Sequence, residues 1–368
     1  MIDWVWYEKW HCQAATPENL SAERTRLVAE RCINRFERFL AAKKGDYDCH
    51  WTEIDAGRLS YEDIIPPRSV TPQIAEEFLK ELVRNYAPKT QQNTYAVLTQ
   101  AYEWCTESVD PIEIDPFQKV YQKHAVKNGD WFLESPSGRE PHIIDLSEAR
   151  NVVRQWNHPL WITVQLLLAK IPRRAGAVSN LDFEDVSITH PGCNWNVHPD
   201  LRRWDDHIIF RSEKRQSDET RNTGNKTKTD SKIPIDEELR DALLWYLCTR
   251  PQPDSPSDPL FLTTQSKMRL SGKIISNKFI RRAKELGYFY GPNDDDNLNP
   301  HYWRHWGTTH YEDQFGGDAN TPGNTSMTDY LRGDSREGIK QLYNSYSIEK
   351  RDTILNAMPT FLESYADD

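Results

Sequence analysis

The sequence predicts a mainly α-helical protein with a small antiparallel β-sheet, divided into two domains. Its 368 residues are enough for two domains that each bury a core. Apolar residues recur at helical spacing along most of the chain, whereas only three short segments alternate as strands do. A stretch rich in Gly, Pro and Ser at residues 127–142 has the composition of a linker, and we place the domain boundary there.

The N-terminal part is expected to contain three helices. In residues 21–44 apolar side chains recur at helical spacing after Ser21, which is a candidate N-cap. A second helix is expected after Thr71, because threonine caps a helix and the following Pro72 fits its first turn. A third helix is expected over residues 90–107. Together they predict a small all-helical domain.

The expected helices and the linker divide the chain into four regions. Residues 1–20 form an N-terminal extension, 21–126 the helical domain, 127–142 the linker and 143–368 a second domain with a C-terminal tail. The second domain is expected to combine helices with the small sheet. Its three strands are expected in LDFEDVSI, in HIIFR around Ile208 and at Lys232–Ile235.

The composition is that of a folded protein, with 37% hydrophobic and 28% charged residues. The apolar stretch Trp161–Ala169 is among the longest and is much shorter than the ~20 residues that cross a bilayer, so we expect no membrane span. The first residues have neither the basic region nor the cleavage site of a signal peptide. We therefore expect a cytoplasmic protein.

The formal net charge of −10, taken alone, argues against a nucleic-acid partner, because neutralising phosphates requires Lys and Arg. Basic clusters around Arg202, Lys214 and Lys226 could still form a positive face on an acidic body. The six cysteines are scattered, and none has the spacing of a zinc site. We therefore expect no metal and no cofactor.

Two pairs of residues could bind an anion. His301 and Arg304 are three residues apart in HYWRH, so on a helix they share a face. Arg173 and Arg174 follow an apolar helix and a proline and precede a strand, where a guanidinium can point into a cleft and bind phosphate oxygens. Each pair has a simpler interpretation, a solvated helical face for the first and surface ion pairs for the second.

The segment NKTKTDSKIPI indicates a hairpin turn that enters a strand, with Lys226, Lys228 and Lys232 on or near the turn. A lysine on such a turn can reach a substrate oxygen and donate a proton. Taken alone, the segment is explained equally well by solvated lysines.

The order of these features adds weight to them. An arginine, a hairpin lysine, a His-x-x-Arg pair and a late tyrosine follow one another after a helical domain. This order resembles the tyrosine recombinase (phage integrase) superfamily over about residues 21–346. The first domain, which ends in DPIEIDPFQKV, resembles the SAM-like core-binding domain of that family. The resemblance implies a two-domain architecture, with this helical DNA-binding domain followed by an α/β catalytic domain.

The family motifs assign residues in the second domain. RRAGAVSNLDFEDV is similar to the box that holds the first catalytic arginine, and alignment on Leu181 and Asp185 places that arginine at Arg174. KTKTDSKIP resembles the lysine motif, in which the lysine lies eight residues before the proline; counting back from Pro234 gives Lys226.

The last two motifs assign the remaining catalytic residues. HYWRH resembles H-x-L-R-H and gives His301 and Arg304. LRGDSREGIKQLY resembles the nucleophile motif, in which nine residues separate the third-box position from the tyrosine. That position is Asp334 and the tyrosine is Tyr343. Because Tyr346 would share a helical face with Tyr343, only the nine-residue spacing favours Tyr343.

The sequence departs from the family pattern at three positions. Asp334 stands where the family usually has His or Trp, Ala177 where it has an acidic residue, and Pro172 where it has Gly. A carboxylate would repel a phosphate unless it were protonated or paired with a cation such as Arg332, Arg336 or Arg304. We therefore expect Asp334 to orient an arginine from outside the catalytic set, and His305 is a second supporting candidate.

The resemblance implies a reaction that needs neither metal nor ATP. Arg174 and Arg304 would clamp the phosphate oxygens, and His301 would assist proton transfer. Lys226 would protonate the departing 5′ oxygen, while Tyr343 would form a 3′-phosphotyrosyl bond. A 5′ hydroxyl of a second strand can attack that bond, so the expected activity is site-specific recombination or integration of double-stranded DNA by a tetramer.

The sequence is compatible with several alternatives. The chain could come from a virus, a plasmid or another mobile element, including an archaeal one. A recombinase-fold regulator that binds DNA without cleaving it is a second candidate, to which Asp334 and Ala177 lend weight. A type IB topoisomerase-like enzyme is a third. The apolar tail after Tyr346 could pack on a neighbouring subunit or on its own.

Overall fold

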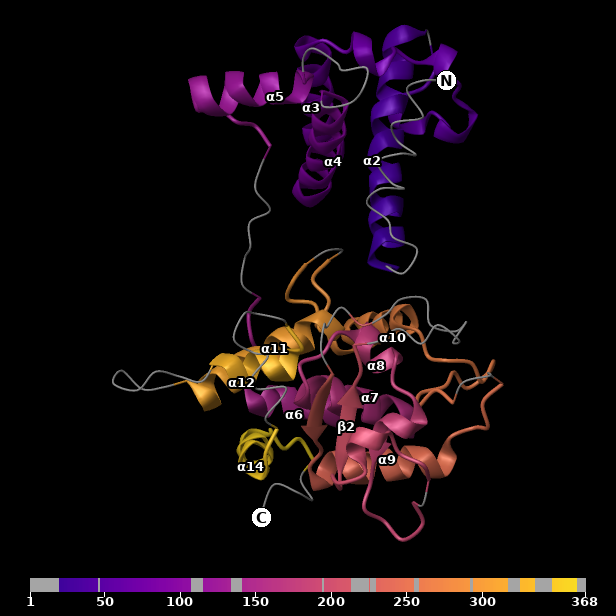
Figure 1. Ribbon diagram of the computed structural model, residues 1–368, viewed down its shortest axis with the longest axis vertical. Helices are drawn as coiled ribbons and strands as arrows, with labels where there is room; N and C mark the ends of the chain where they lie inside the picture. The colour runs from indigo at the N-terminus through magenta and orange to yellow at the C-terminus, as the bar shows by residue number, and fades with distance from the viewer. Residues whose placement is uncertain are drawn as a thin grey trace. The chain divides into compact units, whose positions relative to one another are not determined.

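The computed structural model describes residues 20–45, 47–106, 115–133, 141–193, 195–212, 225, 230–254, 258–291, 294–316, 325–334 and 346–362. The chain divides into two compact units, Met1–Gly138 and Arg139–Asp368 (Figure 1). The division falls inside the stretch 127–142 that the sequence predicts as a linker. None of the described helices is both long and apolar enough to cross a membrane.

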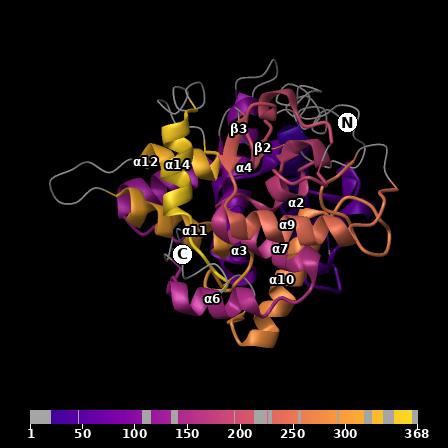
Figure 2. The same ribbon diagram turned by 90° about the horizontal axis from the view of Figure 1, so that it is seen from below.

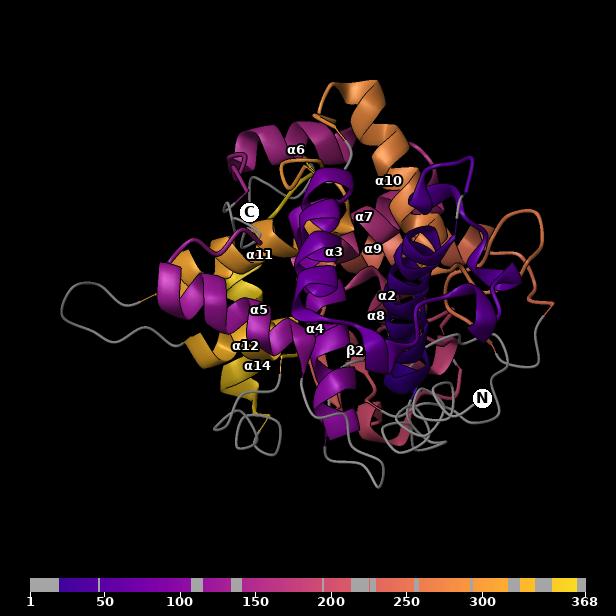
Figure 3. The ribbon, with the colours of Figure 1, turned by 90° about the horizontal axis from the view of Figure 1, so that it is seen from above.

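The described part of the first unit is helical. Its helices are α2 (Leu20–Lys44), α3 (Pro72–Asn85), α4 (Pro88–Thr106), α5 (Pro116–Tyr121) and a π-helical continuation, Gln122–Asn128. Four short 3-10 turns lie between α2 and α3, at Trp51–Glu53, Ala56–Arg58, Tyr61–Asp63 and Pro67–Ser69. Helix α4 packs against both α2 and α3, and α5 packs against α3 and α4 (Figure 3).

The predicted helices of this unit are present, but α4 begins at Pro88 and not at residue 90, and one predicted cap is wrong. Thr71 caps α3, because its side chain accepts a hydrogen bond from the Ile74 amide and Pro72 occupies the first turn. Helix α2 already begins at Leu20, so Ser21 lies inside the helix and is not its N-cap.

An aromatic cluster forms the core of the first unit. The ring of Phe78 lies 4.9 Å from Phe36 and 5.2 Å from Phe39, centroid to centroid, and 6.0 Å from Trp51. Phe117 of α5 completes the cluster at 5.4 Å from Phe36. Because each of these rings is almost fully buried, the cluster joins α2, α3 and α5 into one body.

The second unit contains both helices and the sheet. Its helices are α6 (Leu146–Arg154), α7 (Pro159–Lys170), α8 (Ala175–Ser179), α9 (Glu237–Thr249), α10 (Gly272–Leu286), α11 (Pro300–Phe315), α12 (Thr325–Arg332) and α14 (Ile348–Ala357). The strands β1 (Val186–Ser187), β2 (His207–Phe210) and β3 (Ser231–Pro234) form an antiparallel sheet in the order β1-β2-β3. The predicted class, mainly helical with a small antiparallel sheet, is confirmed.

The first strand is shorter than the sequence predicts. Of the segment LDFEDVSI only Val186 and Ser187 pair with β2. Phe183–Asp185 forms a 3-10 turn, because the backbone amide of Asp182 bonds to the Asp185 carboxylate and closes a capping box.

Helix α7 is the centre of the second unit. It is apolar on every side and buried from Leu160 to Lys170, apart from a partly exposed Trp161. It packs against α9, α11, α6 and α8, and Figure 2 shows α9 and α7 side by side. Because α7 ends at Lys170, its last turn leads directly into the segment that carries Arg173 and Arg174.

The C-terminal tail packs on its own unit. Phe361 is fully buried, and its backbone amide donates to the carboxylate of Glu238. Nζ of the buried Lys170 lies 2.5 Å from both Asp236 and Glu238 and also donates to the carbonyl of Pro359. Of the two alternatives for the tail, this structure therefore has the tail docked on its own subunit.

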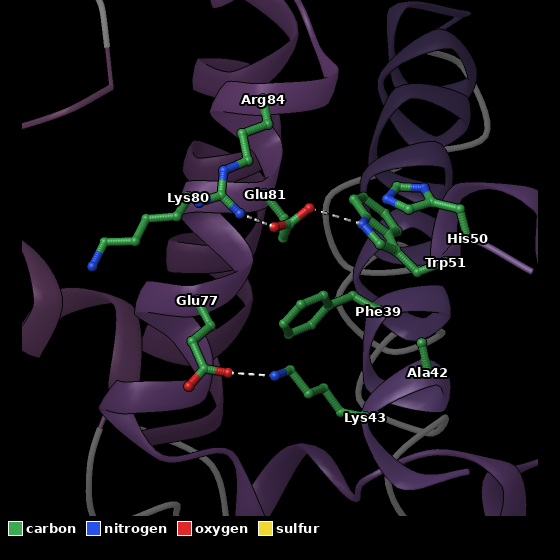
Figure 4. A pocket seen from close by; sticks show the side chains of 9 residues that line it. All are labelled: Phe39, Ala42, Lys43, His50, Trp51, Glu77, Lys80, Glu81 and Arg84. Atoms are coloured by element: carbon green, nitrogen blue, oxygen red, sulfur yellow. Dashed lines mark hydrogen bonds and ion pairs between the residues drawn. The ribbon is translucent and has the colours of Figure 1, made fainter. Parts of the chain in front are cut away.

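A surface pocket of the first unit lies between α2 and α3 (Figure 4). Nζ of Lys43 on α2 is 2.6 Å from Glu77 on α3. Trp51 donates its indole N–H to Glu81 at 3.4 Å. The charged side chains that line it are all engaged in ion pairs: Lys43, Glu77, Lys80, Glu81 and Arg84. The Lys43–Glu77 pair joins α2 to α3, whereas Lys80 pairs with Glu76 and Arg84 with Glu81 within α3.

Candidate active site

Three guanidinium groups surround the carboxylate of Asp334. Nη2 of Arg304 lies 2.8 Å from each carboxylate oxygen. Nε of Arg332 is 3.0 Å from Oδ2, and Nη2 of Arg174 is 3.3 Å from Oδ1. These residues come from separate segments: Arg304 from α11, Arg174 from the start of α8, and Arg332 from the end of α12, which packs beside α11 (Figure 1). We call these four residues the arginine cluster.

A tight turn after α12 places Asp334 in the cluster. Gly333 has a φ of 69°, a left-handed conformation that glycine adopts without strain. Its amide donates to the carbonyl of Tyr330, and the amide of Asp334 donates to the carbonyl of Asp329, as in a Schellman C-cap. The Arg-Gly-Asp triplet therefore folds the chain back onto its own helix.

Arg304 is held on both sides of its guanidinium. Nη1 donates to the carbonyls of Pro172 and Arg332, each at 2.8 Å, while Nη2 binds Asp334. The side chain is only 4% exposed. Burial lowers the pKa of Arg304 to about 10, with Asp334 opposing the shift, so the group stays charged at neutral pH.

A glycine lets α11 come close to the segment that precedes Arg174. A Cβ atom at Gly307 would lie 3.3 Å from both the carbonyl oxygen of Ala169 and the Cβ of Pro172. Because Gly307 is three residues after Arg304 on the same helix, this approach brings Arg304 to the carbonyl of Pro172.

The two neighbouring arginines have different environments. Arg173 is 1% exposed, donates to Ser231 and to the carbonyl of Tyr330, and lies over the ring of Phe210 at 4.8 Å. The side chain of Arg174 is 42% exposed and meets Asp334. Arg173 thus ties the sheet to α12, whereas Arg174 can contact a ligand from solvent.

Two histidines lie on the first turns of α11. The Nε2 atoms of His301 and His305 are 3.0 Å apart, so one ring donates to the other. Burial lowers the pKa of both, and the guanidiniums of Arg304, Arg174 and Arg332 lower it further. Both rings are therefore neutral at physiological pH, and His301 is placed on the same helical face as Arg304, as the sequence predicts.

The carboxylate at the centre of the cluster is ionised. Burial acts to raise the pKa of Asp334, but the guanidiniums of Arg304, Arg332 and Arg174 more than offset this and hold it below its ordinary value. With three guanidiniums around one carboxylate, the cluster keeps an excess of positive charge. Such a site can attract and orient an anion from solvent.

Lys226 and Tyr343 lie outside the described residues. The residue before the lysine is described: Asn225 donates to the carbonyl of Arg211 at 2.6 Å and accepts a hydrogen bond from Asn180 at 2.9 Å. No local pattern predicts this amide pair, because its partners are 45 residues apart.

Tyr346, the alternative to Tyr343, is partly buried and belongs to a hydrogen-bonded aromatic network. Nδ1 of His207 donates to the carbonyl of Asp205, so its Nε2 accepts the hydroxyl proton of Tyr346 at 2.8 Å. The ring of Tyr346 also packs on Trp204 and on Tyr330, at 4.8 and 6.2 Å between centroids. Tyr330 itself is 2% exposed and packs in the core.

The described residues contain no cluster of three or more His, Cys, Asp or Glu side chains that could hold a metal ion. The cations around Asp334 are protein side chains. Of the partners that the sequence predicts for Asp334, Arg304 and Arg332 are present, and Arg336 lies outside the described residues.

No protein-family model and no curated protein sequence matches the chain. Solved structures do match. The Tn1549 transposon integrase in complex with transposon right-end DNA is 16% identical, with a TM-score of 0.53 over 86% of this chain and 97% of that one. A lambda integrase fragment, solved as a dimer bound to a COC′ core site, is 11% identical, with a TM-score of 0.56 over 94% of this chain and 98% of that one.

At this level of identity the likeness concerns the fold. Both neighbours are integrases, and each match extends over nearly the whole of the other chain. The chain therefore has the tyrosine recombinase fold, and the fold class predicted from the sequence motifs is confirmed.

Proposed function

We propose that the protein is a site-specific DNA recombinase or integrase that cuts and rejoins double-stranded DNA through a covalent 3′-phosphotyrosyl intermediate. The observation that carries the proposal is the convergence of Arg174 and Arg304 on one anion in a chain with this fold. Two guanidiniums that already bind a carboxylate have the geometry to bind the oxygens of a phosphodiester.

The reaction begins at the phosphate. Arg174 and Arg304 bind the nonbridging oxygens, where negative charge grows in the transition state. The neutral His301 donates a hydrogen bond to the phosphate and assists proton transfer. Before the phosphate binds, Asp334 orients Arg304 from outside the catalytic set, and His305 supports His301 through the Nε2 contact.

Breaking and rejoining the DNA strand uses Lys226 and Tyr343, which both lie outside the described residues. The hydroxyl of Tyr343 passes its proton to the neutral His301, and its oxygen attacks phosphorus. The bond from phosphorus to the 5′ oxygen breaks, and Lys226 protonates that oxygen. A 5′ hydroxyl then attacks the phosphotyrosyl bond, releases Tyr343 and reseals the strand. The energy of the phosphodiester is retained, so this route needs no ATP, and the cationic side chains supply the charge neutralisation.

The DNA partner and the assembly are part of the same proposal. Exchange between two sites requires four strand cleavages, so we propose a tetramer on two double-stranded sites. The Tn1549 and lambda integrase structures each contain DNA, which supports DNA as the partner of this chain. A chromosome and a mobile element are the natural pair of substrates.

A nicked suicide substrate tests the proposal directly. When cleavage releases a short fragment, the protein stays covalently attached to DNA, and mapping the adducted peptide identifies the tyrosine. We expect an adduct at Tyr343 that is lost in Tyr343→Phe. Strand exchange between two sites then distinguishes a recombinase from a topoisomerase-like enzyme, which would relax supercoils without exchange.

A second candidate has one observation in its favour. The carboxylate of Asp334 already occupies the two arginines that a phosphate would need, as expected of a DNA-binding regulator that no longer cleaves. Such a protein would bind DNA and give no adduct with any suicide substrate that carries its binding site.

A further inference from the structure

The carboxylate of Asp334 uses the hydrogen-bond donors that a phosphate would use. Each Nη atom of Arg304 has two N–H groups. Both N–H groups of Nη1 donate to carbonyls, those of Pro172 and Arg332, and Nη2 lies 2.8 Å from both oxygens of Asp334. The carboxylate lies directly against Nη2, so a phosphate cannot take that place while the carboxylate stays.

The positive charge of the buried Arg304 guanidinium requires a nearby anion when no ligand is bound. Arg304 is 4% exposed, and its guanidinium lies near those of Arg174, Arg332 and Arg173, which disfavour its charged form. A buried cation without a counter-ion strongly destabilises a fold. The carboxylate removes that penalty in the protein without DNA.

We propose that Asp334 is an exchangeable internal anion: its carboxylate occupies the phosphate site of the free protein, and an incoming phosphate displaces it from Arg304 and Arg174. The carboxylate side chain is 23% exposed and Arg174 42%, so the site is open to solvent on the side from which a ligand arrives. Arg332, two residues before Asp334, retains the displaced carboxylate through its Nε.

The exchange differs from a purely orienting role. A residue that only orients Arg304 keeps its bonds throughout, so its removal would weaken or leave unchanged the affinity for an anion. A residue that occupies the site competes with the anion, so its removal tightens binding. That the natural anion is a DNA phosphate rests on the proposed function; the anion exchange itself does not.

Inorganic phosphate is the probe, and thermal unfolding of the full chain without DNA is the measurement. Titrations are run against chloride at matched ionic strength. We expect Asp334→Asn to melt below the wild type in chloride and to be stabilised by phosphate at a half-saturating concentration about tenfold or more below that of the wild type. Arg304→Gln in the Asp334→Asn background should remove this response.

Asp182 supplies a matched control. Its carboxylate also lies between two guanidiniums, 3.0 Å from Arg211 and 2.6 Å from Arg269. Its side chain is only 2% exposed, so an anion has no access. Asp182→Asn should therefore lose stability without any phosphate response beyond that of the wild type.

Two results would overturn the proposal. One is an equal or weaker phosphate response in Asp334→Asn than in the wild type. The other is an enhanced response that persists after Arg304→Gln. If Asp334→Asn is soluble only when purified in phosphate, that outcome supports the exchange. If it is insoluble in both buffers, Asp334→Ser and Asp334→His are titrated instead, with the same two criteria. Since no DNA is present, a missing covalent adduct would reject the proposed function without affecting this result.

Discussion

Nη2 of Arg304 lies 2.8 Å from both carboxylate oxygens of Asp334, and this contact joins two residues that are 30 positions apart. It connects helix α11 to the turn after α12 and places a carboxylate where two arginines converge. The stability of that turn and the charge of the cluster are thus linked.

The turn depends on Gly333. An alanine at a φ of 69° has a Cβ clash that costs about 1 kcal/mol, while asparagine tolerates this conformation better. We expect Gly333→Ala to lower the free energy of unfolding by about 1 kcal/mol and Gly333→Asn by less, measured by urea unfolding. Equal stability of the alanine variant and the wild type would contradict the described turn.

Substitution of Arg173 should mainly lower stability, whereas substitution of Arg174 should mainly lower the rate of DNA cleavage. Arg173→Gln leaves buried acceptors at Ser231 and Tyr330 without their donor, so we expect a loss of about 2–4 kcal/mol in urea unfolding. Arg174→Gln removes a half-exposed group and should change stability by less than about 1 kcal/mol.

The cleavage rate of a suicide substrate tests the catalytic role of Arg174. Arg174→Gln should slow cleavage by roughly a hundredfold or more, as expected when a donor to a developing negative charge is lost. An Arg174→Gln enzyme that cleaves at the wild-type rate would show that this arginine does not bind the phosphate.

Removing the hydroxyl group of Tyr343 or of Tyr346 should distinguish the roles of these two tyrosines. Tyr346→Phe loses one hydrogen bond to His207 and should be destabilised by about 1 kcal/mol, yet still form the DNA adduct. Tyr343→Phe should form none. If instead Tyr346→Phe abolishes the adduct while its melting temperature stays near that of the wild type, the nucleophile is Tyr346.

His207 should make stability depend on pH. Burial lowers its pKa from 6.5 to about 4, so between these values the unfolded chain binds a proton that the folded chain does not. The free energy of unfolding should therefore decrease as pH falls from 7 to 4, with a contribution from His207 of roughly 3 kcal/mol at the lower end.

His207→Gln isolates that contribution, since glutamine can accept the hydrogen bond of Tyr346 but does not titrate. We expect a shallower pH dependence of urea unfolding for this variant. His190→Gln, at an exposed turn, serves as the control substitution. The same slope for His207→Gln as for the wild type would show that His207 is not the source.

The tail contributes to the core of its own subunit. Phe361→Ala removes a fully buried ring and should lower the free energy of unfolding by about 3–5 kcal/mol. Ile348→Ala, on the same tail but 66% exposed, should change it by less than about 0.5 kcal/mol. Loss of stability that depends on protein concentration would instead indicate a tail docked on a neighbour.

Sequence patterns predicted a helix or strand correctly where the interactions that form it lie within one turn of the chain. Thr71 and Pro72 mark the start of α3 because a cap and a fixed φ act within one turn. The strand expected in LDFEDVSI was too long, because a capping box between Asp182 and Asp185 competes with the ladder and is closed by side chains that periodicity does not register.

The sequence by itself determined the class of the fold and the order of the motifs, and it predicted the residues that they assign, since these follow from spacing along one chain. Only the tertiary structure decided that Arg173 is buried while Arg174 is open, that Tyr346 is bound by His207, and that Asp334 closes a ring of arginines. Arg174 and Asp334 are 160 residues apart. Their meeting depends on how α8, α11 and α12 pack, which no local pattern records.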